Sequence, residues 1–199
     1  MAASDDPDDH HTMALADVNL ATVALESGEV AEARRRLEDA MAVITPGGDR
    51  WAVAAVQRDM ARVAATEGNP AEARGLAMAA LEVFSEWRDH SSAAETMEIL
   101  AGMAAADGEM VRAARLAGAA GAVRAAVGGS MPALDRARLV RGTAPALDAL
   151  GPEAFASAEA EGATMTFDQA VEHAIAWAGQ KGRVAAGPAS SSSSSSPAS

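Results

Sequence analysis

A motif that recurs with a period of about 40 residues constrains this chain more than any other feature of its sequence. The motif starts at Gly28, Gly68 and Gly108, and each glycine is followed by an alanine-rich segment that contains arginine. Helical patterns lie on both sides of each glycine, and a glycine just past a helix can adopt the left-handed conformation that ends it. The repeat therefore predicts helical hairpins with a glycine at each turn.

Small and apolar residues occur at matching offsets around the three glycines. Spacings of three, four and seven place them on one face of each helix, where alanine lets two helices approach closely. We expect helices over residues 13–27, 30–44, 51–67, 70–87, 91–107 and 110–127. The matching residues are Leu20, Ala21, Ala24, Ala33, Leu37 and Ala40, then Met60, Ala61, Ala64, Ala73, Ala77 and Ala80, then Leu100, Ala101, Ala104, Ala113, Ala117 and Ala120.

Three further helices are expected after Gly128, over Pro132–Leu150, Pro152–Glu161 and Phe167–Ala178, with prolines suited to the first helical turn. The last helix carries one apolar stripe, and we expect it to cap an open end of the array. Side chains that can cap helix starts are Asp49, Asn69 with Glu72, Ser92 with Glu95, and Thr166 with Gln169.

Composition supports an all-α fold without disulfides. About a quarter of the residues are alanine, the best helix former, whereas aromatic residues make up 3% and cysteine is absent. The polar ends read as disordered, an acidic tail over 1–12 and a serine-rich tail over 181–199. The chain then divides into three hairpins over 13–127 and capping helices over 128–180, an arrangement that forms a helical-hairpin solenoid.

Charge and hydropathy exclude several functions. The net charge is -12 and Lys181 is the one lysine, so binding of nucleic acid is not expected. No apolar stretch is long enough for a membrane span. The acidic, histidine-containing run over residues 5–11 lacks a metal-ligand spacing, and we expect no metal and no cofactor. Without cysteine or a signal peptide, the expected location is the cytoplasm.

The repeat positions resemble those of tetratricopeptide repeats over residues 13–127: small residues where two helices meet, a turn glycine, and two alanines seven apart on the second helix. Two features depart from that family. The period of about 40 residues is longer than the roughly 34 residues common in tetratricopeptide repeats. Aromatic residues are missing at most bulky positions, which predicts looser, alanine-rich packing.

A more specific resemblance covers about 150 residues. Segments 48–51, 112–124, 151–155 and 161–170 are similar to the carboxyl-terminal repeat region of large actinobacterial ATP-dependent regulators with LuxR-type or BTAD/SARP-type DNA-binding domains. That resemblance implies a role in signal-dependent transcription. The P-loop and a basic recognition helix are absent, so the chain resembles either a detached or truncated repeat region or a stand-alone relative.

Catalytic motifs are also missing, and we expect no enzyme. His173 has Glu172 and Asp168 nearby, but no His-Glu-x-x-His or Gly-x-Ser-x-Gly pattern accompanies it. Gly128-Gly129-Ser130-Met131-Pro132 reads as a connector rather than an anion-binding loop. Trp51, Trp87 and Trp177 are interpreted as packing residues, with interface anchoring as the alternative.

The first helix of each hairpin would line a concave groove, as in tetratricopeptide arrays. It presents Arg58 and Arg62 in the second repeat, Glu95 and Glu98 in the third, and Glu26 with Thr22, Leu15 and Val18 in the first. The two arginines can bind the carboxylate of an acidic peptide, or they can pair with the two glutamates across the repeat interface. Both readings remain open at this point.

The sequence therefore predicts a non-catalytic module that binds a protein or peptide partner in its concave groove, associated with transcriptional or signal regulation. An attached or separate ATPase and DNA-binding regulator domain is a candidate partner. The alternative is a regulatory domain whose groove senses a small effector.

Overall fold

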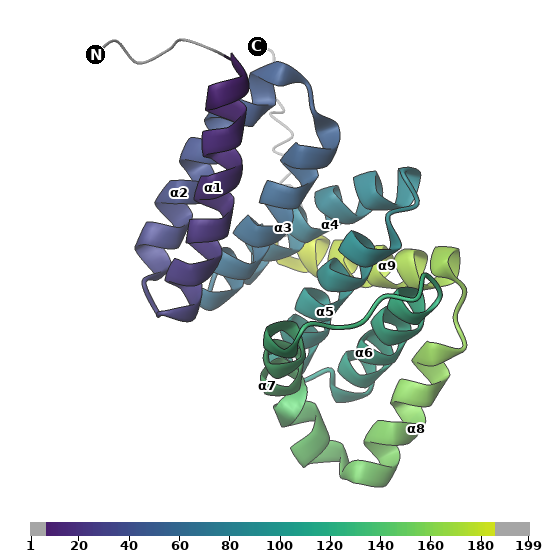
Figure 1. The fold of residues 1–199 in the computed structure, drawn as a ribbon. Coiled ribbons are helices and arrows are strands. Elements are labelled where there is room, and N and C mark those ends of the chain that lie inside the picture. Colours follow the sequence, from purple (N-terminus) through teal and green to yellow (C-terminus); the bar gives the residue numbers. More distant parts are fainter. Residues whose placement is uncertain (1–6, 186–199) are drawn as a thin grey trace, which may run out of the picture.

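A computed structural model describes residues 7–185, with side chains described for Ala14 and for residues 16–180. This part of the chain forms nine α-helices and one 3-10 turn, and it contains no strand (Figure 1). The elements are α1 (Pro7–Glu26), α2 (Val30–Ile44), η1 (Thr45–Gly47), α3 (Arg50–Thr66), α4 (Pro70–Glu86), α5 (His90–Ala106), α6 (Met110–Ala125), α7 (Ala133–Leu150), α8 (Pro152–Ala163) and α9 (Phe167–Ala185).

Consecutive helices form three hairpins, α1 with α2, α3 with α4 and α5 with α6, stacked side by side in an all-α solenoid. Gly28, Gly68 and Gly108 lie between the helices of these hairpins with φ of 81°, 77° and 81°. The next N–H in each turn donates to a carbonyl oxygen in the last helical turn, for example Glu29 to Ala24 at 2.8 Å. The predicted hairpins and their glycine turns are confirmed.

The turns between hairpins have the same geometry as the turns within them. A residue with positive φ therefore follows each of the six repeat helices, α1 to α6. Gly48 and Gly128 have φ of 73° and 67°. Arg88 takes the corresponding place after α4 with φ of 55°, the one described non-glycine residue with positive φ. Its guanidinium binds the Asp168 carboxylate and lies 5.2 Å from the centre of the Phe167 ring. These contacts accompany a conformation that ordinarily favours glycine.

The arginine of the repeated motif joins one hairpin to the next. Arg34 on α2 donates to Glu67 at the end of α3 at 2.9 Å, and Arg74 on α4 donates to Asp107 at the end of α5 at 3.0 Å. In the third copy the arginine comes one residue later, and Arg115 reaches Glu161 on α8 at 2.7 Å. The motif therefore encodes a recurring ion pair between neighbouring units.

Most residues at matching offsets are buried, as predicted, and nearly all of them are alanine. Leu20 is an exception, because 48% of its surface is exposed. The equivalent Met60 is half-buried and Leu100 is fully buried. Burial of these three equivalent side chains increases in this order because α1 packs mainly on α2, whereas α5 also contacts α4, α7 and α9. The prediction was wrong for Leu20 because no helix of the described chain covers that side of α1.

The apolar interior is divided into two clusters by α3. A smaller amino-terminal cluster joins α1 and α2 to one side of α3 through Ala52, Val56 and Val63. A larger cluster includes Ala54, Ala61 and Ala64 of α3 and continues through α4, α5 and α6 into α9. The small side chains keep both clusters thin, consistent with the scarcity of aromatic residues.

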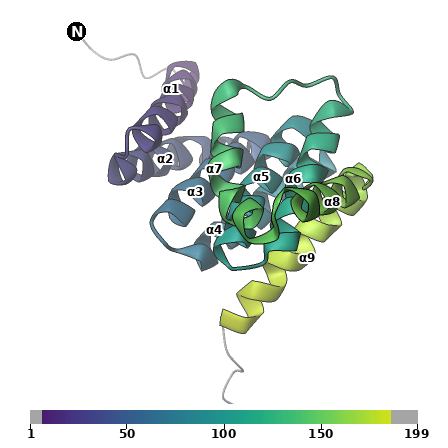
Figure 2. The same cartoon turned by 90° about the horizontal axis from the view of Figure 1, so that it is seen from below.

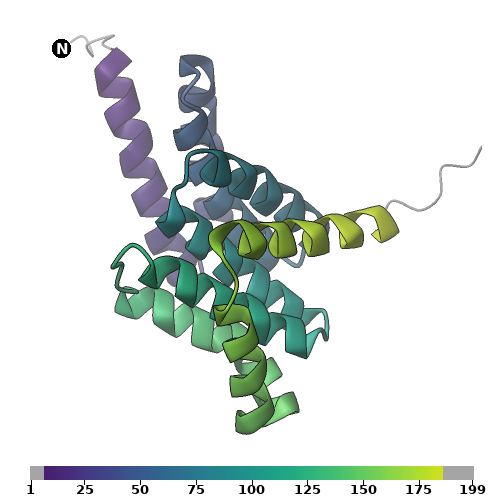
Figure 3. The same ribbon diagram turned by 90° about the vertical axis from the view of Figure 1, so that its right-hand side faces the viewer.

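The three carboxyl-terminal helices cover different sides of the array. α7 lies against α5 and α6 on the side that faces α1 (Figure 2). α8 packs on α6 through Gly118 and Gly162, where the two backbones nearly touch. α9 runs back along α4 (Figure 3). It therefore does not cap an open end of the solenoid, which is where it was predicted to lie. Its stripe is buried at Ala170, Val171, Ala174 and Ala178, and the buried Trp177 adds to it.

Several predicted helix ends differ from the structure. α1 begins at Pro7, inside the tail expected over 1–12, and α9 continues to Ala185, inside the tail expected from 181. Residues 1–6 and 186–199, where the remaining tail predictions fall, lie outside the described residues. Asp49 caps α3 and Thr166 exchanges hydrogen bonds with Gln169, as expected.

Two predicted capping boxes were wrong. α5 begins at His90, and Asp89 accepts a hydrogen bond from the Ser92 N–H at 3.0 Å, so the cap lies three residues before the predicted one. Asn69 precedes α4, but its side chain donates to the Glu72 carboxylate at 2.7 Å and caps no backbone group.

Candidate functional site

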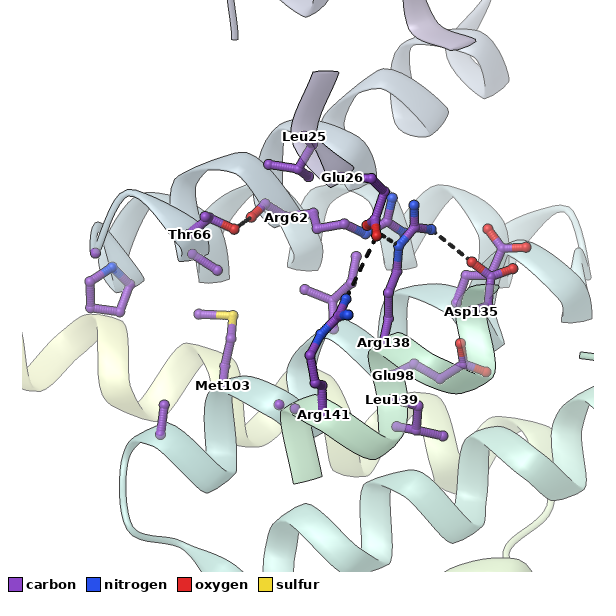
Figure 4. A pocket seen from close by; sticks show the side chains of 18 of the residues that line it. Leu25, Glu26, Arg62, Thr66, Glu98, Met103, Asp135, Arg138, Leu139 and Arg141 are labelled. Carbon is purple, nitrogen blue, oxygen red and sulfur yellow. Dashed lines mark hydrogen bonds and ion pairs between the residues drawn. The ribbon is translucent and has the colours of Figure 1, made fainter. Parts of the chain in front are cut away.

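The first helices of the hairpins and α7 enclose a cavity of about 800 Å³ (Figure 4). Its walls come from the carboxyl-terminal end of α1, from α3 and from α5, and α7 forms the opposite side. α7 approaches α5 closely because Gly102 and Gly142 meet there, where a Cβ added to Gly142 would lie 3.3 Å from the Gly102 Cα. Arg62, Glu95, Glu98 and Glu26 of the predicted groove line this cavity, whereas Arg58 does not, and α7, a helix outside the repeats, forms its opposite side.

The second-repeat arginines share one buried carboxylate. Asp59 is 7% exposed and accepts hydrogen bonds from Arg58 at 3.2 Å and from Arg62 at 3.0 Å. Arg58 also pairs with Glu95 of α5 at 2.7 Å, which confirms the alternative of pairing across the repeat interface. Arg62 does not pair with Glu98, because Asp59 satisfies it within α3. The role of Asp59 was missed, although its position between the arginines was visible in the sequence.

Glu98 pairs with Arg124 on α6 at 2.6 Å instead. The two side chains are 9% and 7% exposed, so this is the most deeply buried ion pair near the cavity. Burial raises the pKa of Glu98, and the hydrogen bond from Arg124 opposes that rise. Arg124 also lies 3.9 Å from Glu95, which therefore bridges α3 and α6. No sequence pattern indicated Arg124, because it belongs to the second helix of its hairpin.

Glu26 links the first repeat to α7. It accepts from Arg138 at 2.6 Å, and Arg141 lies 3.7 Å from its other oxygen. Asp135 holds the opposite side of Arg138 at 2.8 Å. Thr22, predicted beside Glu26, does not line the cavity, and its hydroxyl donates to the Val18 carbonyl oxygen at 3.3 Å.

Arg62, Arg138 and Arg141 lie at the mouth of the cavity near Glu26 (Figure 4), and the wall also carries the carboxylates of Glu95, Glu98, Asp107 and Asp135. Arg62 and Arg138 are mostly buried, whereas Arg141 is 68% exposed. Burial lowers the pKa of Arg62, and the charges of Arg58 and Arg138 lower it further, against the effect of Asp59. Asp59 and Asp135 pair with Arg62 and Arg138, so the exposed Arg141 is the cation at this mouth that is most accessible to an added negative charge.

Apolar side chains form another part of the wall. They come from α1, α3, α5 and α7, and the amino-terminal turn of α4 adds a proline. A site of this size with an apolar wall and a few charged groups is suited to a side chain or a small molecule. The main apolar residues are Leu25, Ala65, Pro70, Ile99, Met103 and Leu139.

The remaining candidates lie outside the cavity. His173 is half-buried on α9, where burial and then Arg112 and Arg115 of α6 lower its pKa and so favour the neutral imidazole. Trp177 is buried, as predicted for a packing residue. Trp51 donates to Asp89 at 2.9 Å and meets Phe84 edge to face. Trp87 is largely exposed, so packing does not account for it. The Gly128–Pro132 loop connects α6 to α7.

Within the described part of the chain, no group of three His, Asp or Glu side chains is placed to hold a metal ion. Among the helices of that part, none has the length and apolar character needed to cross a bilayer. The acidic run over residues 5–11 has no described side chains.

Comparison with known proteins agrees with the fold. The family model described as tetratricopeptide repeat matches residues 12–86, which hold α1 to α4 except the first turns of α1. This segment is a tetratricopeptide-repeat region, as its sequence pattern predicts. Searches of curated proteins and of solved structures found no significant match. Tetratricopeptide repeats generally mediate protein–protein interaction, and the family is generally non-catalytic.

Proposed function

We propose that the chain is a non-catalytic protein-interaction module that binds an extended segment of a partner protein in the cavity between the hairpins and α7. The observation that carries this proposal is the mouth of the cavity, where the exposed Arg141 lies 3.7 Å from Glu26 next to apolar side chains of the wall. Such a site suits a segment that places an apolar side chain inside and an acidic group at the mouth.

A charge reversal at Arg141 tests this proposal. Arg141 lines the cavity, yet it is exposed and only 3.7 Å from Glu26, so Arg141→Glu should leave the fold intact. Replacement of Arg58 or Arg62 would be less informative, because both hold the buried Asp59. Arg50→Glu is the matched control, since Arg50 is an exposed, ion-paired arginine outside the cavity.

The probes are peptides selected from a displayed random library against the purified chain. We expect the selected peptides to compete with one another, to carry acidic and apolar residues, and to lose at least about tenfold in affinity on Arg141→Glu. Arg50→Glu should change their affinity little. Equal binding to both variants would exclude the cavity as the peptide site.

We infer that the partner belongs to signal-dependent transcription in the cytoplasm, on the strength of the resemblance of segments 112–124 and 161–170 to ATP-dependent regulators. A P-loop ATPase or DNA-binding regulator domain, attached or separate, is then the expected partner. Purified regulator domains from the same genome, tested in titrations with the wild-type chain and with Arg141→Glu, provide the assay. Failure of every such domain to bind would refute this assignment.

A small-effector sensor is the second candidate, because a cavity of about 800 Å³ also matches a metabolite-sized ligand. Calorimetric titration of a metabolite library separates the two functions. A compound that saturates one site and is displaced by the selected peptides would favour the sensor.

A further inference from the structure

Helix α7 has an outer face that is exposed except at Ala144, which is half-buried. An apolar stripe follows this face with successive spacings of four, three, four and three residues. Val140 is 61% exposed and Leu147 is 41% exposed, although both are large apolar side chains. The members of this outer stripe are Ala133, Ala137, Val140, Ala144 and Leu147.

The outer stripe differs from the two faces of α7 that the fold uses. Thr143 and Ala146 are buried against the array. Asp135 and Arg138 line the cavity. At 100° per residue, the stripe lies on the side of α7 away from both of these faces. It is therefore a separate surface, distinct from the cavity.

The spacing of the stripe is that of a helix–helix seam. Alternating steps of three and four residues keep apolar side chains along one line of a helix, where a second helix can lie against them. From residue 133 to residue 147 the line extends about 21 Å at 1.5 Å per residue. A partner helix of roughly four turns would cover it.

Charge identifies the kind of partner. Arg136 and Arg141 stand on opposite sides of the stripe at 100° per residue, and both are exposed. Among the described side chains, Arg136 has no ion pair within 4.0 Å, and Arg141 has only the 3.7 Å contact with Glu26. Arg136 and Arg141, one on each side of the apolar seam, complement a helix that carries Asp or Glu opposite them, and the exposed Asp148 follows Arg141 one heptad later on the same flank.

A second copy of this chain fits the seam poorly. In a parallel pair, Arg136 of one copy would lie beside Arg141 of the other, at the flanking positions of a two-helix seam. In an antiparallel pair that sets Val140 against Ala144, the two copies of Arg141 would meet. Both arrangements bring like charges together, which disfavours self-association.

We propose that the outer stripe of α7 docks an amphipathic helix of another protein, one whose apolar stripe is flanked by acidic residues. Arg141 borders both the stripe and the cavity, whereas Val140 and Arg136 line no part of the cavity, so variants of these two residues test the stripe separately from the function of the cavity.

Two synthetic 21-residue peptides test the proposal with the full chain. Both carry leucine at the two apolar heptad positions, but one has glutamate and the other lysine at the flanking positions, and both are used below the concentration at which they self-associate. Fluorescence anisotropy should show that the glutamate peptide binds at least about tenfold more tightly. Arg136→Glu should remove most of that difference, and 0.5 M salt should reduce it.

Val140→Glu should weaken binding of the glutamate peptide at least about tenfold. The matched control is Val43→Glu, because Val43 is an exposed valine on α2, and circular dichroism of both variants checks that they fold. Failure of the glutamate peptide to bind, equal loss with both valine variants, or equal binding of the two peptides would overturn the proposal. A dimer in sedimentation experiments that Val140→Glu dissociates would assign the stripe to a second copy instead.

Discussion

Two glycines three residues apart on α6 should respond to alanine in opposite directions. Gly118 faces α8, and a Cβ built on it would lie 1.9 Å from the Glu159 carbonyl oxygen. Gly121 is exposed and has nothing within 4 Å of the same position. Because both glycines lie inside one helix, the gain in helix propensity on Gly→Ala is the same for both, about 1 kcal/mol at most. The difference between them therefore measures the α6–α8 contact.

Gly118→Ala must push α8 outward until the separation between the new Cβ and the Glu159 oxygen rises from 1.9 Å to the ordinary contact range of 3.4–4 Å. Flexible side chains cannot absorb this shift, since the obstructing atoms belong to the backbone. Overpacking of this kind costs about 1–3 kcal/mol, which should exceed the propensity gain. We expect Gly118→Ala to lower the free energy of unfolding and Gly121→Ala to raise it by about 0.5–1 kcal/mol.

Thermal and urea unfolding followed by circular dichroism provide the assay. For a chain of this length, 1 kcal/mol corresponds to about 2–4 °C in Tm. Gly162→Ala serves as an independent check, because its Cβ would meet the Arg115 carbonyl oxygen at 2.0 Å from the α8 side. If Gly118→Ala is as stable as Gly121→Ala, the backbones of α6 and α8 are not in contact and the expected overpacking is refuted.

Three further changes test other contacts by urea unfolding. Arg124→Met should lower the free energy of unfolding by about 3–5 kcal/mol, because it leaves Glu98 buried without its counter-charge. A further Glu98→Met should recover part of that loss. A double variant less stable than Arg124→Met would contradict this explanation. Burial and then two arginines of α6 lower the pKa of His173, so the folded state resists protonation of this side chain. The free energy of unfolding should therefore fall as the pH drops below about 6.5, and His173→Gln should weaken that dependence. Identical pH profiles of the wild type and the variant would exclude this role of His173. Arg88→Gly should be more stable than Arg88→Ala by about 1 kcal/mol, because both lose the side-chain contacts and only glycine adopts the positive φ freely; equal stability would mean that the turn relaxes.

The repeats could be predicted from the sequence because they are local. A turn glycine, a cap such as Asp49 and alanines on one face each act within a few residues, and local pattern is what a sequence displays. The turn at Arg88 was not predicted, because Arg88 adopts the positive φ typical of glycine and its residue type does not indicate this conformation. The start of α5 was misplaced for a similar reason, since Ser92 matched a capping box while Asp89 provided the cap.

The candidate site was predicted only in part because it depends on contacts between distant segments. Arg58 and Glu95 occupy equivalent faces of neighbouring repeats, so their pairing followed from the period of the repeat. Arg138 comes from a helix outside the repeats, and it reaches Glu26 across 112 residues of chain. No periodicity relates those two positions, so the wall that α7 adds to the cavity appears only in the folded molecule.

The division of the interior by α3 links local stability to binding. In a repeat array, stability is close to a sum over neighbouring units, so the amino-terminal hairpin depends on its own small cluster and on one side of α3. That hairpin also contributes Leu25 and Glu26 to the cavity. A partner seated there adds its binding free energy to the unit with the fewest neighbours. Occupancy of the cavity and resistance of the first hairpin to fraying are therefore thermodynamically coupled.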